Sequence, residues 1–585
     1  MILSVSEIMA LLTGVALFLF GMTLMGDGLK KVAGSRLELI LYRLSGTPLR
    51  GLLLGTGVTA VIQSSCATSV MVVGFVNAGM MPLRRSVNVI LGAILGTSVT
   101  GWVICLGYLQ GAGTLKSLLS TATLTAAVAL VGVILRMFTK TPAKRHIGDI
   151  LLGFAVLMTG MSAMSGAVSA LGQDPAFVSL LQSLDHPLAG ILAGAVFTAV
   201  LQSASAAVGI IQALSFTGAM QAQQALGLLM GVAIGAAAPV LLAAIGAGRA
   251  GKRASLVYPI AGVLGVAAVG GVFYAVNAFV PFGFLSQTVD PFSVAALNSV
   301  LRLVMVAALT PFAGLIERLT GVLVREKKSK AIEAGPMLED RFLSYPTLAI
   351  EQSRMAVDAM AKLSRSGVML ALKIIGSYTA AEFEEVRALE KSVDDYEDKL
   401  GSFLMRLTGK ELDRRQNEDV AKFLRALTDL ERISDHALNL GESAKELHDK
   451  KIRFSEDAQR EMDVLFAALT EIMDLTAGAF ESDDAAKAKR VEPLEERIDE
   501  LCETMKRRHV ERLQSGKCTI SQGFVFNDIL TNVERVSDHC SNLALEMLEV
   551  RDDTMASHGY LHELKAKEKQ AMDEAYEEYA ARYVI

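Results

Sequence analysis

The sequence predicts an all-α protein in which a polytopic membrane domain is followed by a cytoplasmic helical bundle domain. The distribution of charge is the first observation behind this prediction. Residues 1–316 contain 16 Lys and Arg but only 7 Asp and Glu, far fewer charges than a soluble domain of that length carries. Residues 317–585 contain 40 Lys and Arg and 54 Asp and Glu. The two parts therefore have net charges of +9 and −14. A wholly soluble protein is excluded, and the acidic second part argues against nucleic acid as a partner.

The second observation is the length of the uncharged runs. Residues 51–83 and 186–248 contain no Asp, Glu, Lys or Arg, and both runs exceed the roughly 20 apolar residues that cross a bilayer. Glu7 and the absence of basic residues before Ile8 favour a first membrane span over a cleaved signal. The lipid bilayer of the cell inner membrane is therefore the expected location, with several spans.

Lys and Arg in the short loops predict the orientation. The loops at residues 172–187 and 281–291 contain no Lys or Arg, whereas basic residues cluster at 30–50, 84–85, 136–145 and 249–253 and from Arg318 onward. Because basic loops stay in the cytoplasm, the acidic second part is expected there too. The expected full spans are residues 8–28, 87–108, 117–135, 149–171, 224–246, 255–280 and 293–316.

The membrane domain, residues 1–316, contains a duplication. An offset of 139 residues aligns Gly14 with Gly153 and Gln63-Ser64 with Gln202-Ser203, and the register holds for roughly 90 residues. Repeat 1 is expected at about residues 10–101 and repeat 2 at about 149–240. Their opening spans cross the membrane in opposite directions, which is typical of inverted repeats.

Two apolar segments are left over, at residues 51–80 and 190–218. Each lies between loops on one side of the membrane, so we expect two re-entrant hairpins that enter from opposite faces. The alternative is that each segment forms one or two ordinary spans. Inverted repeats with broken segments are the plan of secondary transporters, in which the binding site lies near the midplane.

The two hairpins carry similar polar cores, Gln63–Ser69 and Gln202–Ser205. Hydroxyl and amide groups in hydrocarbon are costly unless they are satisfied, so we expect the two cores to face a shared cavity. Helix packing through small residues is the alternative. Neither core contains a carboxylate. Hydroxyl donors and the N-termini of broken helices suit an oxyanion, and unwound carbonyls suit a sodium ion.

These motifs resemble those of the sodium-dependent phosphate cotransporters. The shared features are the QSSCATS run, the second QSAS run and the GxxxGT pattern at Gly92 to Thr97. The resemblance implies a sodium-coupled transporter of inorganic phosphate, with sodium as the coupling ion. The residues that it implies for phosphate binding are Gln63, Ser64, Ser65, Gln202 and Ser203. Those that it implies for sodium binding are Thr68, Ser69 and Ser205.

This chain departs from the family pattern at several side-chain oxygens. Ile94 and Ala233 stand where the family has asparagine, and Ala204 replaces the second serine of the motif. Ala236-Ala237 replaces a threonine pair in repeat 2. These departures affect the positions from which sodium coupling and anion choice are expected to arise.

Arg302 is the one cation expected deep inside a span, about ten residues from its start. An arginine inside the membrane is by default a functional candidate, here as a fixed charge in phosphate binding. The alternative is a side chain that reaches the interface or pairs with a backbone carbonyl.

The second part begins with a charged linker at residues 317–340. Apolar residues then recur at helical spacing, which predicts a double three-helix bundle over residues 341–555 and a C-terminal helix over 556–585. An ERxSDH motif starts at Glu431 and again at Glu534, so this part also repeats.

Carboxylates in the repeated ExxxD motifs fall at positions i and i+4, on one helix face. The motifs resemble those of the PhoU family, which regulates phosphate transport and binds metal clusters. This resemblance implies a divalent or iron-type metal. The implied ligands are Glu390, Asp394, Glu431, Asp435, Glu495, Asp499, Glu534 and Asp538. A solvated acidic face is the alternative, and His436 and His539 are expected to point off the stripe of carboxylates.

The sequence contains no P-loop, GxSxG or HExxH motif, so no enzyme is expected. The preferred interpretation is a sodium-coupled phosphate transporter with a cytoplasmic regulatory domain. Two alternatives stay open: a phosphate exporter, and a phosphate-sensing signalling protein with little transport. A homodimer is compatible with the sequence, which leaves the oligomeric state open.

Overall fold

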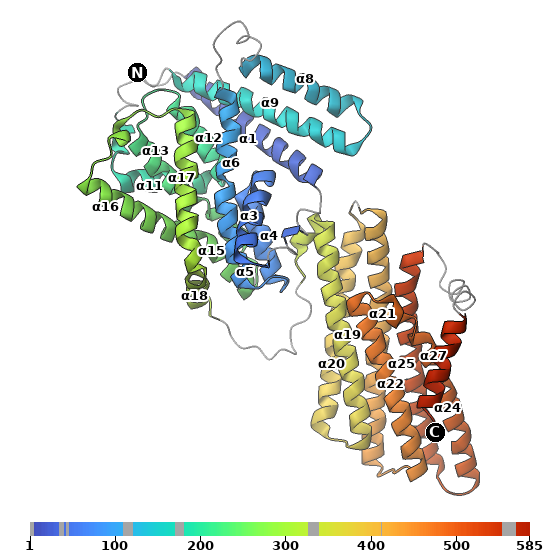
Figure 1. Ribbon diagram of the computed structural model, residues 1–585. Helices are drawn as coiled ribbons and strands as arrows, with labels where there is room; N and C mark the ends of the chain where they lie inside the picture. Colours follow the sequence, from blue (N-terminus) through green and yellow to red (C-terminus); the bar gives the residue numbers. More distant parts are fainter. Residues whose placement is uncertain are drawn as a thin grey trace. The chain divides into compact units, whose positions relative to one another are not determined.

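The computed structural model describes residues 5–33, 40–41, 46–108, 121–169, 179, 181–325, 338–410, 412–552 and 569–585. The chain divides into two compact units, Met1–Lys327 and Lys328–Ile585, and the division falls within the expected linker. The described secondary structure is helical apart from one isolated antiparallel bridge between Gln221 and Thr288. The all-α prediction is therefore confirmed (Figure 1).

The first unit contains two matching series of helices. Repeat 1 contains α3 (Pro48–Ile62), α4 (Ser65–Asn77), α5 (Leu83–Gly96) and α6 (Ser98–Cys105). Repeat 2 contains α11 (Pro187–Leu201), α12 (Ala204–Ser215), α13 (Ala222–Gly235) and α14 (Ala238–Ala243). The offset of 139 residues carries the bounds of α3 onto those of α11, and the bounds of α5 onto those of α13. The predicted duplication thus extends to the helix boundaries.

The first helices of the two repeats pack against each other as antiparallel partners. These helices are α1 (Val5–Ala33) and α9 (Pro142–Ser169). Gly14 of α1 meets Gly160 of α9, and Gly21 meets Gly153. Gly14 and Gly153 are equivalent under the offset, as are Gly21 and Gly160, so each contact is the counterpart of the other. This exchange is the geometry of a pseudo-twofold axis between inverted repeats.

The remaining helices of the first unit follow or connect the repeats. Between the repeats lies α8 (Thr121–Phe138), which packs along α9 (Figure 1). After repeat 2 come α15 (Arg249–Gly265), the π-helical turn η3 (Val266–Gly270), α16 (Gly271–Phe279), the 3₁₀ turn η4 (Gly283–Ser286), α17 (Pro291–Leu309), the 3₁₀ turn η5 (Thr310–Phe312) and α18 (Ala313–Leu323).

Six helical stretches in the described residues are long and apolar enough to cross a membrane. They are Met9–Ala33, Leu83–Cys105, Pro142–Ala167, Ala222–Ala243, Arg249–Phe279 and Pro291–Leu323. These stretches correspond to six of the seven expected spans. The seventh expectation, residues 117–135, begins outside the described residues, and its described part belongs to α8.

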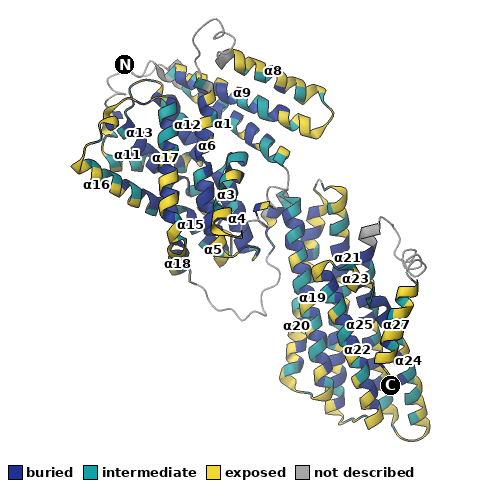
Figure 2. Ribbon diagram, viewed as in Figure 1, coloured by how far each residue is buried: buried dark blue, intermediate teal, exposed yellow. Residues whose placement is uncertain are grey.

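Burial separates the inner helices of this unit from its outer helices. The second limbs of the hairpins, α4 and α12, are mostly buried, as are α5 and α13 (Figure 2). In contrast, α8 and α16 expose large apolar side chains such as Phe138 and Phe279. Because apolar side chains on a membrane helix face lipid, α8 and α16 have the surface of peripheral helices.

The second unit is built from two three-helix bundles. The first bundle contains α19 (Pro346–Gly376), α20 (Ala380–Thr408) and α21 (Arg414–Asp449), preceded by the 3₁₀ turn η6 (Asp340–Ser344). The second contains α22 (Glu456–Ser482), α24 (Val491–Gln514) and α25 (Ile520–Asp552), with the short α23 (Ala485–Ala488) after α22. The equivalent helices α21 and α25 pack against each other. The C-terminal helix α27 (Lys569–Arg582) lies against α24. The expected segment 556–568 lies outside the described residues.

Candidate functional site

Each hairpin turns at a glutamine in the left-handed backbone conformation. Gln63 has a φ of 58° between α3 and α4, and Gln202 has a φ of 54° between α11 and α12. Few residues other than glycine adopt this backbone conformation. Its recurrence at equivalent positions indicates that the hairpin requires this turn. The turn breaks one apolar helix into two limbs, as the hairpin prediction requires.

The serine after each glutamine begins the next helix. Ser64 accepts a hydrogen bond from the Ala67 backbone N–H at 3.1 Å, and Ser203 accepts one from Ala206 at 3.2 Å. A serine N-cap satisfies one N–H of the first helical turn, while the others have no partner within the helix. Both hairpins therefore present a helix N-terminus at the break, with its partial positive charge.

In repeat 1, the polar side chains of the break are held from several directions. The Gln63 amide donates to the Ala60 carbonyl, and its Oε1 is buried without a hydrogen-bond partner. Ser65 lies 3.2 Å from the Tyr258 hydroxyl of α15. Thr68 accepts from Thr59 at 3.0 Å. These contacts fix α4 against α3 and α15 and leave one buried amide oxygen without a hydrogen-bond partner.

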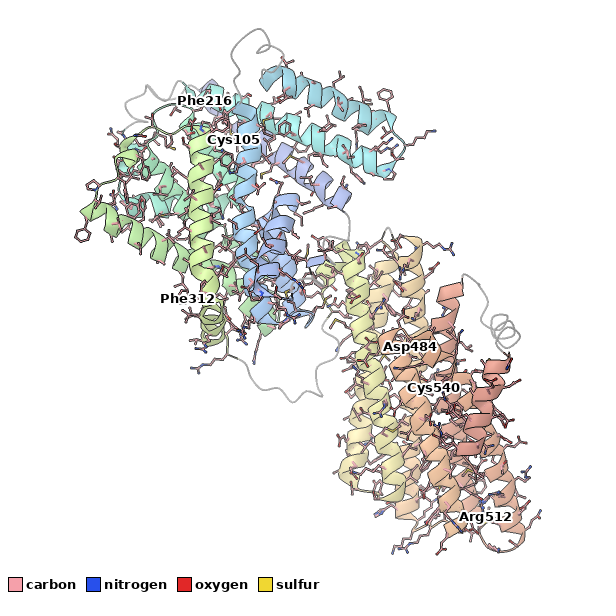
Figure 3. The ribbon with its side chains drawn as sticks, viewed as in Figure 1. Cys105, Phe216, Phe312, Asp484, Arg512 and Cys540 are labelled. Carbon is pink, nitrogen blue, oxygen red and sulfur yellow. The ribbon has the colours of Figure 1, made fainter. Side chains whose placement is uncertain are left out.

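In repeat 2, the break is attached to α6. Ser205 donates to the Thr100 hydroxyl at 3.4 Å. Further along α12, the buried Gln212 amide donates to the Gly101 carbonyl at 3.1 Å and to the Pro291 carbonyl at 3.0 Å. Gln212 also contacts Cys105, which is labelled at the end of α6 in Figure 3. The second hairpin is thus fixed to α6 and to the start of α17.

The two hairpin tips differ in exposure. Gln63 is buried, with 7 % of its surface exposed, whereas Gln202 is exposed; Ser64 and Ser203 are both half-buried. The contacts given above attach the first tip to α15 and the second to α6 and α17, and none of them joins the two tips directly. The expectation that the two cores face a shared cavity therefore stays a prediction.

Arg302 lies on α17 and is 1 % exposed. Its Nε donates to Asn298 Oδ1 at 3.0 Å, and its Nη1 donates to the Ile94 carbonyl at 3.1 Å. The Tyr258 hydroxyl lies beside the guanidinium. Since Tyr258 also contacts Ser65, Arg302 is two contacts away from the first hairpin tip. The hydrogen bond to the Ile94 carbonyl is the backbone pairing that the alternative interpretation expected. The role of Arg302 in phosphate binding stays a prediction.

The residues expected to bind sodium have different surroundings. Thr68 and Ser205 have hydroxyl partners in Thr59 and Thr100. Ser69 is fully buried, and its Oγ has no hydrogen-bond partner. Their role as sodium ligands stays a prediction.

The sequence analysis missed two residues that connect these groups, Tyr258 and Gln212. Both are polar side chains in apolar segments, which is the signal that could have identified them. Tyr258 precedes Pro259 inside α15, where a tyrosine needs a hydrogen-bond partner once it is buried.

Six of the eight expected metal ligands form two clusters in the second unit. Within each cluster, carboxylate oxygens lie within 4.8 Å of one another. The first cluster contains Glu390, Asp394 and Asp435, and the second contains Glu495, Asp499 and Asp538. The two others lie beside the clusters: Glu431 is 3.6 Å from Arg432, and Glu534 is 2.6 Å from Lys506.

The electrostatics of both clusters favour a bound cation. Burial and neighbouring carboxylates raise the pKa of Glu390 and of Asp394. In the second cluster, burial and Asp499 raise the pKa of Glu495 to about 8, and burial and Asp538 raise that of Asp499 to about 6. Carboxylates at such distances repel each other, and an oxygen-preferring cation would neutralise them. The donor sets therefore fit a metal ion.

The fold and the duplicated hairpins define a multi-pass inner-membrane protein with the plan of a secondary transporter. Residues 17–166 and 156–292 match the Na+/Pi-cotransporter family, and residues 357–444 and 464–547 match the PhoU domain. The chain thus belongs to the Na+/Pi-cotransporter family, in the type that carries PhoU domains, and is a membrane protein of phosphate transport.

Individual relatives cover either the whole chain or one of its units. A Salmonella typhimurium protein named "Putative inorganic phosphate export protein YjbB" is 25 % identical over 93 % of this chain and 97 % of its own length. YqeW of Bacillus subtilis, named as uncharacterized, is 29 % identical over 53 % of this chain and 96 % of its own. A Thermotoga maritima protein named as PhoU homolog 1 of the phosphate-specific transport system is 29 % identical over 23 % of this chain and 58 % of its own.

Proposed function

We propose that this chain carries inorganic phosphate across the inner membrane through the two hairpin tips, and that its second unit regulates this movement. One duplicated observation carries the proposal: a left-handed glutamine precedes a serine N-cap in both repeats. Each break combines a helix N-terminus with hydroxyl and amide groups, and this combination favours an oxyanion. Membership of the family supports phosphate as that oxyanion.

The unequal exposure of the tips supports a carrier that alternates between two states. Gln63 is buried and Gln202 is exposed, although the two residues are equivalent in the duplication. Inverted repeats that adopt different conformations open a central site to one side of the membrane at a time. Exchange of the two conformations would open it to the other side.

The direction of movement follows from gradients, because a symmetric site binds phosphate from either side. Relatives that match nearly the full chain are named for phosphate export. This name favours outward movement as the cellular role of this chain. The distinction between uptake and export requires flux measurements in both directions.

The central test is radiolabelled phosphate flux in proteoliposomes. We expect Gln63→Ala and Gln202→Ala each to reduce flux by at least tenfold, because each removes an amide at a hairpin turn. Gln182→Ala is the matched control, since Gln182 is exposed and lies outside the hairpins. Wild-type flux in both tip variants would reject the hairpin site. No flux from folded wild-type protein would instead favour the phosphate-sensing alternative.

The second unit is proposed as a regulator that holds metal ions at its two carboxylate clusters. The match to PhoU domains supports this role, and the closeness of the carboxylates supports a cation. Truncation after Arg325 tests it. Transport that persists but no longer responds to phosphate supply would support a regulatory unit, and loss of all transport from a folded membrane unit would contradict it.

A further inference from the structure

Arg302 is a buried cation that lacks an anionic partner. Among the Lys and Arg side chains that the structure describes before Lys328, it alone is buried. Its partners are an amide oxygen of Asn298, the backbone carbonyl of Ile94 and the phenol of Tyr258. No carboxylate in the described part of the chain forms an ion pair with it. A buried guanidinium is very costly without a counter-charge, so this site is built for an anion.

Hydrogen-bond donors beside the guanidinium support the same conclusion. Arg302 Nη2 and Asn298 Nδ2 are both buried without a hydrogen-bond partner of ordinary length and angle. Asn298 Oδ1 accepts a hydrogen bond from Arg302 Nε. This bond orients the Asn298 amide and fixes its NH₂ group as a donor. The two residues are one helical turn apart on α17 and therefore share a face. Two fixed donors on one face match neighbouring oxygens of an oxyanion.

A chain of contacts connects this face to the first hairpin. The Tyr258 hydroxyl lies beside Arg302 and 3.2 Å from Ser65, which is in the first turn of α4. Arg302 and the N-terminus of α4 thus contribute positive potential to one region. The carbonyl of Ile94, an oxygen that a cation could bind, accepts from Arg302 instead.

We infer that Arg302 is a built-in counter-cation of the phosphate site, held by Asn298 and Tyr258, so that phosphate binds without sodium. This inference rests on the proposed function and revises the sodium coupling expected from the resemblance. A guanidinium is always protonated, so its charge is present whether or not sodium is. A sodium ion in the same region would be repelled by it. Sodium and phosphate then have no favourable coupling, and each leaves the affinity for the other unchanged.

The test is phosphate binding to the purified full-length protein in detergent, measured by equilibrium dialysis with radiolabelled phosphate. Sodium chloride is compared with choline chloride at equal ionic strength. For the wild type we expect dissociation constants that agree within about twofold. Arg302→Gln should lower phosphate affinity by at least tenfold in both media. Arg249→Gln, an exposed cation of α15, is the matched control and should bind like the wild type.

Two conservative variants keep the test valid if Arg302→Gln fails to fold. Arg302→Lys keeps the charge and loses the planar donor set, so binding should weaken but stay independent of sodium. Tyr258→Phe removes only the hydroxyl and should weaken binding several-fold, again equally in both media. These variants distinguish positioning from charge.

The outcomes separate the inference from the proposed function. Wild-type binding at least tenfold tighter in sodium would overturn the inference and leave phosphate transport standing. Arg302→Gln with wild-type affinity would also overturn it. Absence of phosphate binding in both media would reject the proposed function itself, and the inference with it.

Discussion

The imidazole rings of His436 and His539 stack with their centroids 5.8 Å apart, where the equivalent helices α21 and α25 meet. His436 Nδ1 lies 2.8 Å from Asn532 Oδ1, and His539 Nδ1 lies 2.8 Å from Asp429 Oδ1. Both pairs join positions that are equivalent in the duplication, except that one has aspartate where the other has asparagine. Each ring contacts a residue of the opposite helix, and neither is a member of the two carboxylate clusters.

Acidification is expected to weaken this contact. Burial and the neighbouring His539 lower the pKa of His436 below its usual 6.5. The unfolded chain then binds a proton that the folded chain resists, so the stabilisation is complete above pH 6.5 and is lost as the pH falls below it. We expect His436→Gln to flatten the decrease in melting temperature between pH 7.5 and 5.5. His448→Gln, an exposed histidine at the end of α21, should leave the decrease unchanged.

Metal binding to the second cluster should depend strongly on pH. Because burial and Asp499 raise the pKa of Glu495 to about 8, a cation must displace a proton there at neutral pH. Manganese affinity, measured by calorimetry on the full-length protein, should rise about tenfold per pH unit up to about pH 8.

Substitutions of two neighbouring glutamates on α24 test this metal assignment. Glu495→Gln should abolish binding at the second cluster and leave that at Glu390, Asp394 and Asp435. Glu496→Gln, an exposed neighbour outside the cluster, should keep both. Equal stoichiometry for wild type and Glu495→Gln would contradict the metal assignment.

Asp358 on α19 is expected to destabilise the bundle at neutral pH. Burial raises the pKa of this carboxyl to about 6, and its Oδ1 is buried without a hydrogen-bond partner. The pKa of Asp358 is higher in the folded chain than in the unfolded chain, so this carboxyl stabilises the folded state below pH 3.8. That stabilisation is lost as the pH rises to 6. Asp358→Asn should therefore increase the free energy of unfolding at pH 7.5 by on the order of 1 to 2 kcal/mol. The gain should vanish near pH 4, whereas the exposed Asp449→Asn should give none.

The contact between α1 and α9 predicts a steric effect. A Cβ at Gly160 would lie 2.3 Å from the Phe18 backbone nitrogen, so Gly160→Ala must separate the helices. We expect a loss of about 1 to 3 kcal/mol, seen as a lower melting temperature in detergent. Gly166→Ala on the same helix has nothing within 4 Å of the added methyl group and should be neutral or slightly stabilising. Equal melting temperatures would show that the contact does not hold the repeats together.

The duplication was predictable because it leaves a fixed offset in the sequence, and the offset carried the bounds of α3 onto those of α11. The left-handed glutamines were not predictable, since glutamine has no preference for that conformation and only the hairpin requires it. Among the carboxylates, spacing placed Glu431 and Asp435 on one helix face. Which of them joins Glu390 depends on how α20 packs on α21, and sequence spacing does not contain that information.

The glycine contacts between α1 and α9 also constrain how such a chain could arise. Gly14 meets Gly160 and Gly21 meets Gly153, so the surface is complementary to its own inverted copy. A protein with a single repeat could bury that surface only against a second molecule inserted into the membrane the other way up. A chain that joins two copies, with the extra helix α8 between them, always contains one repeat in each orientation. A duplicated chain can therefore insert into the membrane in a single topology, whereas a single-repeat protein would have to insert in two.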